Sequence, residues 1–133
     1  AVNREEAVQV TGGDYKDLND LFDRLHALGP KIVAISDGPD GAYASDGTKR
    51  LKMPIYPDPS PPYERTGAGD AFTSAFVAAL IHGSDIEGAL QWGPINSMSV
   101  VQHVGAQKGL LSEAQLSKLL QQSPKWYRAT PLK

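Results

Sequence analysis

The 133-residue sequence predicts an α/β fold, and three observations support this. Residues 31–36 form a short apolar run after a segment with helical periodicity, which indicates a strand covered on both faces as in parallel sheets. A hairpin pattern follows at residues 42–55, and segments with helical patterns fill most of the second half. The order helix, strand, hairpin and several helices favours α/β over a bundle or a sandwich.

Composition places the chain among ordinary globular proteins, with 41% hydrophobic and 21% charged residues. Its length corresponds to one domain. Thirteen basic against fifteen acidic residues give a net charge of −2, so we expect no nucleic-acid partner. The chain has no cysteine, which excludes disulfides, thiolate metal sites and cysteine nucleophiles. No apolar run approaches the ~18 residues of a membrane span, so we expect no membrane association and a cytoplasmic location.

The first third contains two predicted helices and the buried strand. Residues 3–11 suit one or two helical turns, which two glycines then interrupt. Asp14 is the expected N-cap of the second helix, whose apolar residues recur at helical spacing up to residue 28. Gly29 and Pro30 end that helix before the strand at residues 31–36.

The middle of the chain is rich in turn residues. Residues 37–41 are expected to form a loop, and two strands at residues 42–45 and 49–55 are joined by an Asp-Gly turn. Residues 54–62 contain five prolines, which excludes a helix or a central strand. We expect an extended surface segment there, and a polyproline recognition ligand is the alternative.

The second half is predicted to be helical. Residues 71–81 are apolar on nearly every face, which predicts a helix buried all round. Capping-box patterns at residues 84–87 and 112–115 open two further helices. Pro94 is expected to kink the first of these or to lie near a helix start, and that helix is expected to end near Val104 with Gly105 as C-cap. The tail after Pro124 carries two possible anchors, Trp126 and Tyr127.

The motif TGAGD at residues 66–70 carries the chemistry. Its two glycines let a backbone approach a ligand closely, and the start of the following helix adds free N–H groups and about half a positive charge. Together they form an anion hole for a phosphate, with the carboxylate of Asp70 at its rim to take a proton from an alcohol. Taken alone, the same residues also suit a tight turn in which Asp70 caps the helix. The motif is neither a Walker A loop nor a dinucleotide fingerprint.

The wider sequence resembles the PfkB family of ribokinase-like carbohydrate kinases. Residues 65–83 (RTGAGDAFTSAFVAALIHG) resemble that family's second signature, and residues 3–6 match its N-x-x-E motif. Residues 35–41 match its nucleotide-contacting glycine loop, and residues 92–109 match the late segment that closes over the adenine and holds a monovalent cation. The resemblance implies the C-terminal, ATP-binding part of a ribokinase-like three-layer α/β/α fold, formed by residues 1–133 as a single region.

The resemblance also assigns residue roles. It makes Asp70 the catalytic base on the substrate hydroxyl, with an anion hole at Gly67, Ala68 and Gly69. Glu6 and Asn3 would act on the magnesium–ATP complex, partly through water. The nucleotide phosphates and ribose would lie along Ser36, Asp37, Gly38, Pro39, Asp40 and Gly41. The alternatives are that Asn3 caps the first helix, that Glu6 is a solvated helical residue, and that residues 36–38 form an ordinary turn at the end of a strand.

Two departures from the family pattern concern the adenine and the cation. Pro94 stands where the family often has Asn or His beside the adenine, and Asn96 is the alternative contact. The implied K⁺ site would involve Glu64, Thr66, Val100, His103, Gly105 and Gly109, several of them through backbone carbonyls. Glu64 replaces the usual Asp and Arg65 the usual Thr, which leaves dependence on a monovalent ion open.

Family members are substantially longer than this chain, so the resemblance implies a fragment that lacks the N-terminal sugar-binding part and a small β lid. We expect a kinase that transfers the γ-phosphoryl of ATP to a sugar or nucleoside-like substrate, and an isolated chain without turnover. A nucleotide-binding or regulatory module without phosphotransfer and a structural or interaction domain are the alternatives. Because the family often dimerises through the lid, a homodimer of the longer protein remains open.

Overall fold

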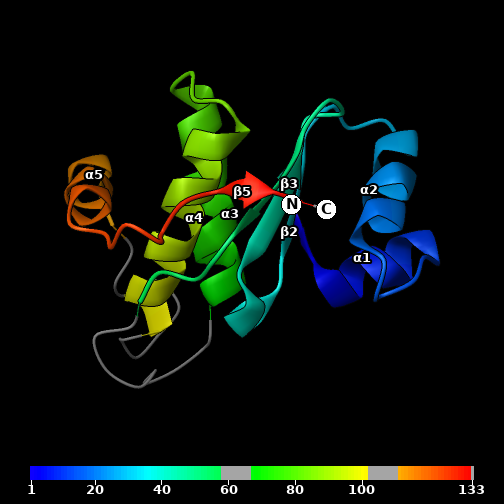
Figure 1. Cartoon of the computed structure of the whole chain (residues 1–133), viewed down its shortest axis with the longest axis horizontal. Coiled ribbons are helices and arrows are strands. Elements are labelled where there is room, and N and C mark those ends of the chain that lie inside the picture. The colour runs from blue at the N-terminus through cyan, green and yellow to red at the C-terminus, as the bar shows by residue number, and fades with distance from the viewer. Residues whose placement is uncertain (58–66, 102–110, 133) are drawn as a thin grey trace.

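A mixed β-sheet lies between two layers of helices in the computed structural model, which describes residues 1–57, 67–101 and 111–132 (Figure 1). In the described part of the chain the strands follow sequence order. They are β1 (Val2–Asn3), β2 (Val33–Ser36), β3 (Ala42–Ser45), β4 (Arg50–Met53) and β5 (Thr130–Pro131). Helices α1 and α2 cover one face, and α3, α4 and α5 lie on the other side (Figure 1). The predicted three-layer α/β/α fold is confirmed.

The buried strand is present, but its neighbours differ from the prediction. Strand β2 pairs in parallel with β1 and antiparallel with β3, so the sheet is mixed rather than parallel. The predicted hairpin is confirmed, because β3 and β4 pair antiparallel around the turn at Asp46. The proline-rich segment lacks helix and strand at residues 54–57, and its remainder lies outside the described residues.

Helices α1 (Arg4–Thr11) and α2 (Leu18–Ala27) pack on one face of the sheet, around a core that includes Phe22 and Ile35. The predicted N-cap Asp14 is wrong, because α2 begins later and its cap is Asp17, which accepts a hydrogen bond from the Asp20 N–H. The carboxylate of Asp14 instead accepts from the Lys16 N–H and closes a local turn.

Helix α3 (Ala68–Ile81) contributes only part of its surface to the core. Ala71, Phe72, Ala75, Phe76 and Ala79 are buried, but Val77 and Ile81 are 42% and 78% exposed. The prediction of a helix buried all round is therefore wrong for this chain. An apolar composition does not itself supply neighbours for every face of a helix.

Helix α4 (Ile86–Val101) runs through Pro94 without a break. The predicted Ser84 capping box is wrong, since Asp85 accepts the hydrogen bond from the Gly88 N–H. The predicted end of the helix near Val104 and Gly105 lies outside the described residues. For α5 (Glu113–Gln121), the predicted capping box at Ser112 is confirmed.

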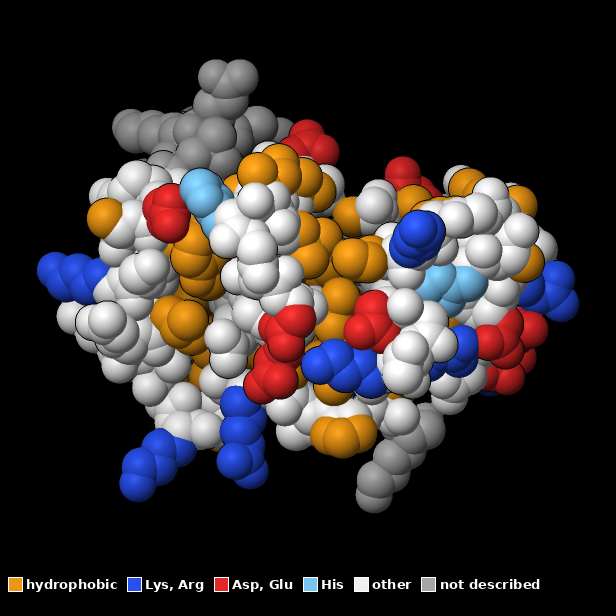
Figure 2. All heavy atoms as spheres, turned by 90° about the horizontal axis from the view of Figure 1, so that it is seen from above, with side chains coloured by type: hydrophobic (Ala, Val, Ile, Leu, Met, Phe, Trp, Pro, Cys, Tyr) orange, Lys and Arg blue, Asp and Glu red, His pale blue; other side chains and the backbone are white. Residues whose placement is uncertain are grey.

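The C-terminal tail returns to the sheet, which the sequence did not indicate. Strand β5 pairs antiparallel with β4 and covers its outer edge. Tyr127 is the anchor, being 3% exposed with its hydroxyl donating to the Gln91 carbonyl at 2.6 Å, whereas Trp126 is 56% exposed. Figure 2 shows basic and acidic side chains interspersed on the face it presents. None of the helices in the described ranges combines the length and apolar character needed to cross a bilayer.

Candidate functional site

Three of the motifs found in the sequence meet at one end of the sheet, where the loop after β2 lies beside the start of α3 (Figure 1). A cavity of about 150 Å³ lies between them. Its walls come from the loop after β2, the segment after β4, the first turns of α3 and the middle of α4. They are formed by Ser36, Gly38, Pro39, Gly41, Ala42, Ile55, Tyr56, Ala68, Gly69, Phe72, Pro94, Ser97 and Met98.

The loop after β2 is compact, with the 3₁₀ turn Gly38–Asp40 at its centre. The Asp37 N–H donates to the Gly41 carbonyl at 2.8 Å, and the Gly41 N–H donates to the Gly38 carbonyl at 3.1 Å. Gly41 has φ of 98°, and a Cβ there would collide with the carbonyl oxygen of Met53, so only glycine fits. Tight local bonding thus brings the predicted residues Gly38, Pro39 and Gly41 to the cavity.

The start of α3 presents backbone rather than a side-chain cap. Its N-cap is Gly67 in the left-handed conformation, with no side-chain cap hydrogen bond. The first-turn N–H groups have no partner within the helix and carry its positive dipole end. Asp70 is exposed in this first turn, and the N-cap is Gly67 rather than Asp70.

Helix α4 fixes the position of α3. The Ser97 hydroxyl donates to the Ala68 carbonyl at 2.7 Å, and the buried Asn96 amide donates to the Ala71 carbonyl at 2.8 Å. The Asn96 side-chain oxygen accepts from the Leu111 N–H at 3.0 Å, so both ends of that amide have protein partners. Of the two residues predicted beside the adenine, Pro94 lines the cavity and Asn96 does not.

Several cavity residues were not among the predicted site residues. Ser97 is one, and Tyr56 is another, with its hydroxyl donating to the Leu119 carbonyl at 2.8 Å and its ring meeting Tyr127 edge to face at 5.0 Å. Met98 also lines the cavity, and it packs against the hydrophobic core as well.

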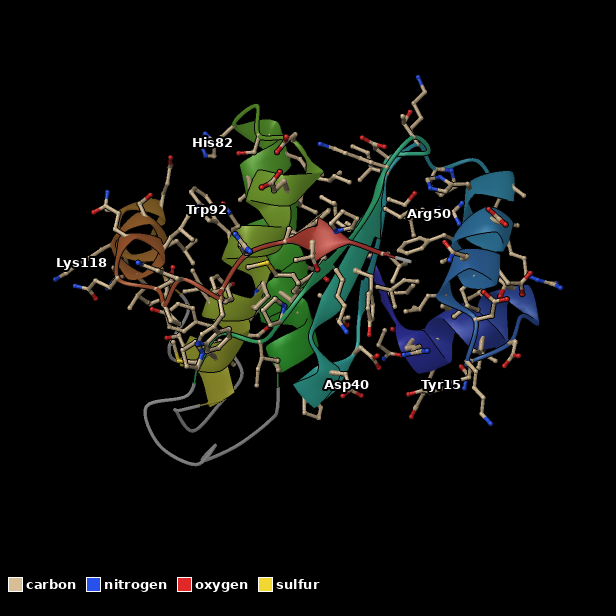
Figure 3. All side chains as sticks on the ribbon, viewed as in Figure 1. Tyr15, Asp40, Arg50, His82, Trp92 and Lys118 are labelled. Atoms are coloured by element: carbon tan, nitrogen blue, oxygen red, sulfur yellow. The ribbon has the colours of Figure 1, made fainter. Side chains whose placement is uncertain are left out.

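A second cavity of about 350 Å³ lies on the α1 side of the same loop. It is lined by Asn3, Arg4, Glu5, Tyr15, Ser36, Asp37, Gly38, Pro39 and Asp40. Figure 3 shows Tyr15 and Asp40 at the same end of the sheet. The two cavities share Ser36, Gly38 and Pro39, so the loop forms a wall of both.

The predicted magnesium residues have a structural role in this geometry. The Asn3 side chain accepts from the Glu6 N–H at 2.7 Å, and the Glu6 carboxylate accepts from the Asn3 N–H at 2.9 Å. This reciprocal capping box confirms that Asn3 caps α1. Within the described ranges, no group of three or more His, Asp or Glu side chains is arranged to hold a metal ion.

The predicted monovalent-cation site falls mostly outside the described residues. Val100 is fully buried in α4. The remaining predicted residues of that site are not described, namely Glu64, Thr66, His103, Gly105 and Gly109.

The carboxylate of Asp37 lies at the junction of α1 and β3. It accepts from the Arg4 guanidinium at 2.7 Å and from the Tyr43 hydroxyl at 3.1 Å. Burial, together with the charge of Asp37 and the hydrogen bond to it, raises the pKa of Tyr43 to about 12. Burial alone would lower the pKa of Arg4, but the hydrogen bond and charge of Asp37 outweigh it and raise that pKa.

Comparisons with known proteins agree with this arrangement. A ribokinase of Bacillus subtilis is 37% identical over 94 residues, which cover 71% of this chain and 31% of the relative. A cytidine kinase of Thermococcus kodakarensis is 33% identical over 104 residues, which cover 77% and 36%. The structure of Arabidopsis thaliana ribokinase complexed with ribose and ATP matches with a TM-score of 0.78 at 29% identity, over 89% of this chain and 39% of that one.

The chain thus spans about a third of the length of these curated relatives. The sequence model described as "pfkB family carbohydrate kinase" matches residues 1–113, which is most of the chain. Together with the fold and the meeting of the motifs, this match shows that the chain belongs to the pfkB family of carbohydrate kinases.

Proposed function

We propose that this chain forms the nucleotide-binding part of an ATP-dependent kinase that phosphorylates a hydroxyl group of a sugar or nucleoside-like substrate. The observation that carries the proposal is the cavity where the glycine loop, the start of α3 and α4 meet. Family membership supports phosphotransfer, and the ribokinase and cytidine kinase relatives support the substrate class.

The cavity walls suit a nucleotide. Ile55, Tyr56, Phe72, Pro94 and Met98 supply apolar surface for a flat base. The wall at Gly38, Pro39 and Gly41 carries few side-chain atoms, so the ribose and phosphates can approach its backbone closely.

The start of α3 suits the phosphate that is transferred. Backbone N–H groups from Gly67 to Gly69 would donate to its oxygens, where negative charge is spread in the transition state. Ser97 and Asn96 hold this turn in place through carbonyls that point away from the anion, so the donors are preorganised. Bound Mg²⁺ would neutralise phosphate charge. Asn3 and Glu6 would act on it through water, because each side chain already bonds the other residue's main-chain N–H in the cap of α1.

In this proposal Asp70 acts as the base. Its carboxylate is exposed in the first turn of α3, so an acceptor hydroxyl can reach it. It would take the hydroxyl proton as that oxygen attacks the phosphorus, while the adjacent backbone holds the transferring group.

We further infer that residues 1–133 act as one nucleotide-binding region and that acceptor binding needs the part of the relatives' length that this chain does not span. The pure chain should then bind magnesium–ATP without phosphorylating a sugar. The proposal also includes that K⁺ supports the kinase activity and that the longer protein forms a homodimer.

The test replaces Asp70 with Asn in the smallest version of the protein that phosphorylates a sugar. We expect kcat to fall by about 10²–10⁴-fold, the usual contribution of a positioned base, with little change in magnesium–ATP affinity. The matched control is Glu87→Gln, which removes an acid from the first turn of the neighbouring helix α4 and should leave kcat unchanged. A kcat within tenfold of wild type for Asp70→Asn would contradict base catalysis.

Calorimetry separates the other functions. Binding of magnesium–ATP without phosphorylation of any sugar by the longest available protein would indicate a module without phosphotransfer. Absence of nucleotide binding would indicate a structural domain and contradict the proposal.

A further inference from the structure

The side chain of Asp37 is 5% exposed, although it begins a surface loop. One of its oxygens accepts from Arg4 Nη1 at 2.7 Å and also from the Tyr43 hydroxyl at 3.1 Å. A buried carboxylate is stable only when donors or an opposite charge compensate for the lost water. The hydrogen bonds from Arg4 and Tyr43 therefore fix the position of this carboxylate.

The sheet brings these groups together. In the parallel pairing of β1 with β2, Asn3 lies opposite Ser36, so Arg4 and Asp37 each follow directly after the paired residues. Arg4 is itself held by Tyr15, whose carbonyl accepts from Arg4 Nε at 2.7 Å and whose ring lies 4.5 Å from the guanidinium.

The main chain transmits this constraint to the loop. The Asp37 N–H donates to the Gly41 carbonyl, and the Asp37 carbonyl accepts from the Asp40 N–H at 3.0 Å. Asp37 is thus bonded to the far end of the loop through its backbone and to α1 and β3 through its side chain. The loop between these residues lines both cavities.

We propose that Arg4 and Tyr43 are positioning residues that act through Asp37 to hold residues 37–41 in the shape needed for nucleotide binding. Neither residue has to touch the nucleotide for this role. The proposal rests on the proposed nucleotide site, and it gives the Asp37 carboxylate a structural role in place of a ligand contact.

The first experiment measures magnesium–ATP affinity of this chain by calorimetry. Arg4→Met should weaken binding by about 10–100-fold, because it leaves the buried Asp37 carboxylate without its charged partner and so releases the loop that this carboxylate holds. Arg4→Lys keeps the cation and should recover part of the loss. The matched control is Arg24→Met, since Arg24 pairs with Asp20 at 2.9 Å on an exposed surface and should leave affinity unchanged.

The second experiment needs no nucleotide. Hydrogen exchange at the amides of Asp37, Asp40 and Gly41 should be faster in Arg4→Met than in wild type, and unchanged in Arg24→Met. Tyr43→Phe removes a single hydroxyl and should also accelerate this exchange, which repeats the test if Arg4→Met does not fold.

The outcomes separate the two proposals. If wild type does not bind magnesium–ATP, the proposed function fails, and faster exchange in Arg4→Met still supports the control of the loop by Arg4. Exchange equal to wild type in both Arg4→Met and Tyr43→Phe would overturn that control. Faster exchange together with wild-type magnesium–ATP affinity would show that the loop's shape does not matter for binding. An equal loss of affinity in Arg4→Lys and Arg4→Met would overturn the ion pair with Asp37 as the cause.

Discussion

Replacing Gly93 with Ala tests whether the close approach of α3 and α4 shapes the cavity. A Cβ at Gly93 would lie 2.5 Å from two ring atoms of Phe72, which is much closer than real Cβ contacts. Phe72 is 3% exposed and stacks on Phe76 at 5.8 Å, so its ring cannot move away freely. Either the ring or a helix must shift.

The magnitude follows from two opposing effects. Overpacking of a core costs about 1–3 kcal/mol, while exchanging Gly for Ala inside a helix gains about 1 kcal/mol. The 2.5 Å contacts with a buried ring place the overpacking cost at the upper end of that range, so the net loss of unfolding free energy should be about 2 kcal/mol, which lowers Tm by roughly 5–9 °C in a domain of this size. Because Phe72 and the neighbouring Pro94 both line the cavity, magnesium–ATP affinity should fall as well.

Thermal unfolding followed by circular dichroism measures the effect, with Gly88→Ala as control in the same helix. A Cβ at Gly88 would lie 3.2 Å from the Cβ and Oγ of the exposed Ser84, a mild contact that a shift of a few tenths of an ångström relieves at the start of the helix. That variant should keep or slightly raise Tm. A Tm for Gly93→Ala at or above wild type would refute the argument that this glycine sets the helix spacing.

Three further predictions concern single residues. Gly69→Ala places a methyl group where no atom lies within 4 Å, so Tm should hold while calorimetry shows magnesium–ATP affinity about tenfold weaker, and wild-type affinity would contradict close ligand approach there. Because the pKa of Tyr43 is raised to about 12 from about 10 in the unfolded chain, its contribution to stability is complete below pH 10 and is lost as pH rises toward 12. Urea unfolding should therefore show the gap between wild type and Tyr43→Phe shrinking over that range, and a constant gap would contradict this. Tyr127→Phe removes the hydroxyl that donates to the Gln91 carbonyl and should cost about 1–2 kcal/mol in urea unfolding, whereas Trp126→Phe at the exposed neighbour should cost little.

Local signals in the sequence predicted the elements that depend on nearby residues. The hairpin around Asp46 and the capping box at Ser112 were correct because their partners lie within a few positions. The prediction placed the cap of α2 at Asp14 instead of Asp17, since two aspartates lie near the helix start and Asp14 closes the preceding turn by accepting from the Lys16 N–H.

Long-range contacts could not be predicted in this way. Strand β5 pairs with β4, and its two residues, Thr130–Pro131, are too few to show the alternating pattern that predicts a strand. Ser97 and Tyr56 line the cavity because distant segments bring them there. Tyr56 belongs to no motif, and Ser97 lies in the family-like segment 92–109 without a predicted role. The exposure of Val77 and Ile81 likewise depends on which neighbours α3 has.

The amino-acid sequence by itself determined the fold class, the family resemblance and the three motifs, because each is encoded in residue types at short spacing. Only the tertiary structure decided that these motifs share one cavity and that Asp37 pairs with Arg4, 33 positions away. The physical reason is that spacing along the chain sets local backbone bonding, whereas packing of the sheet between two helical layers sets which side chains meet.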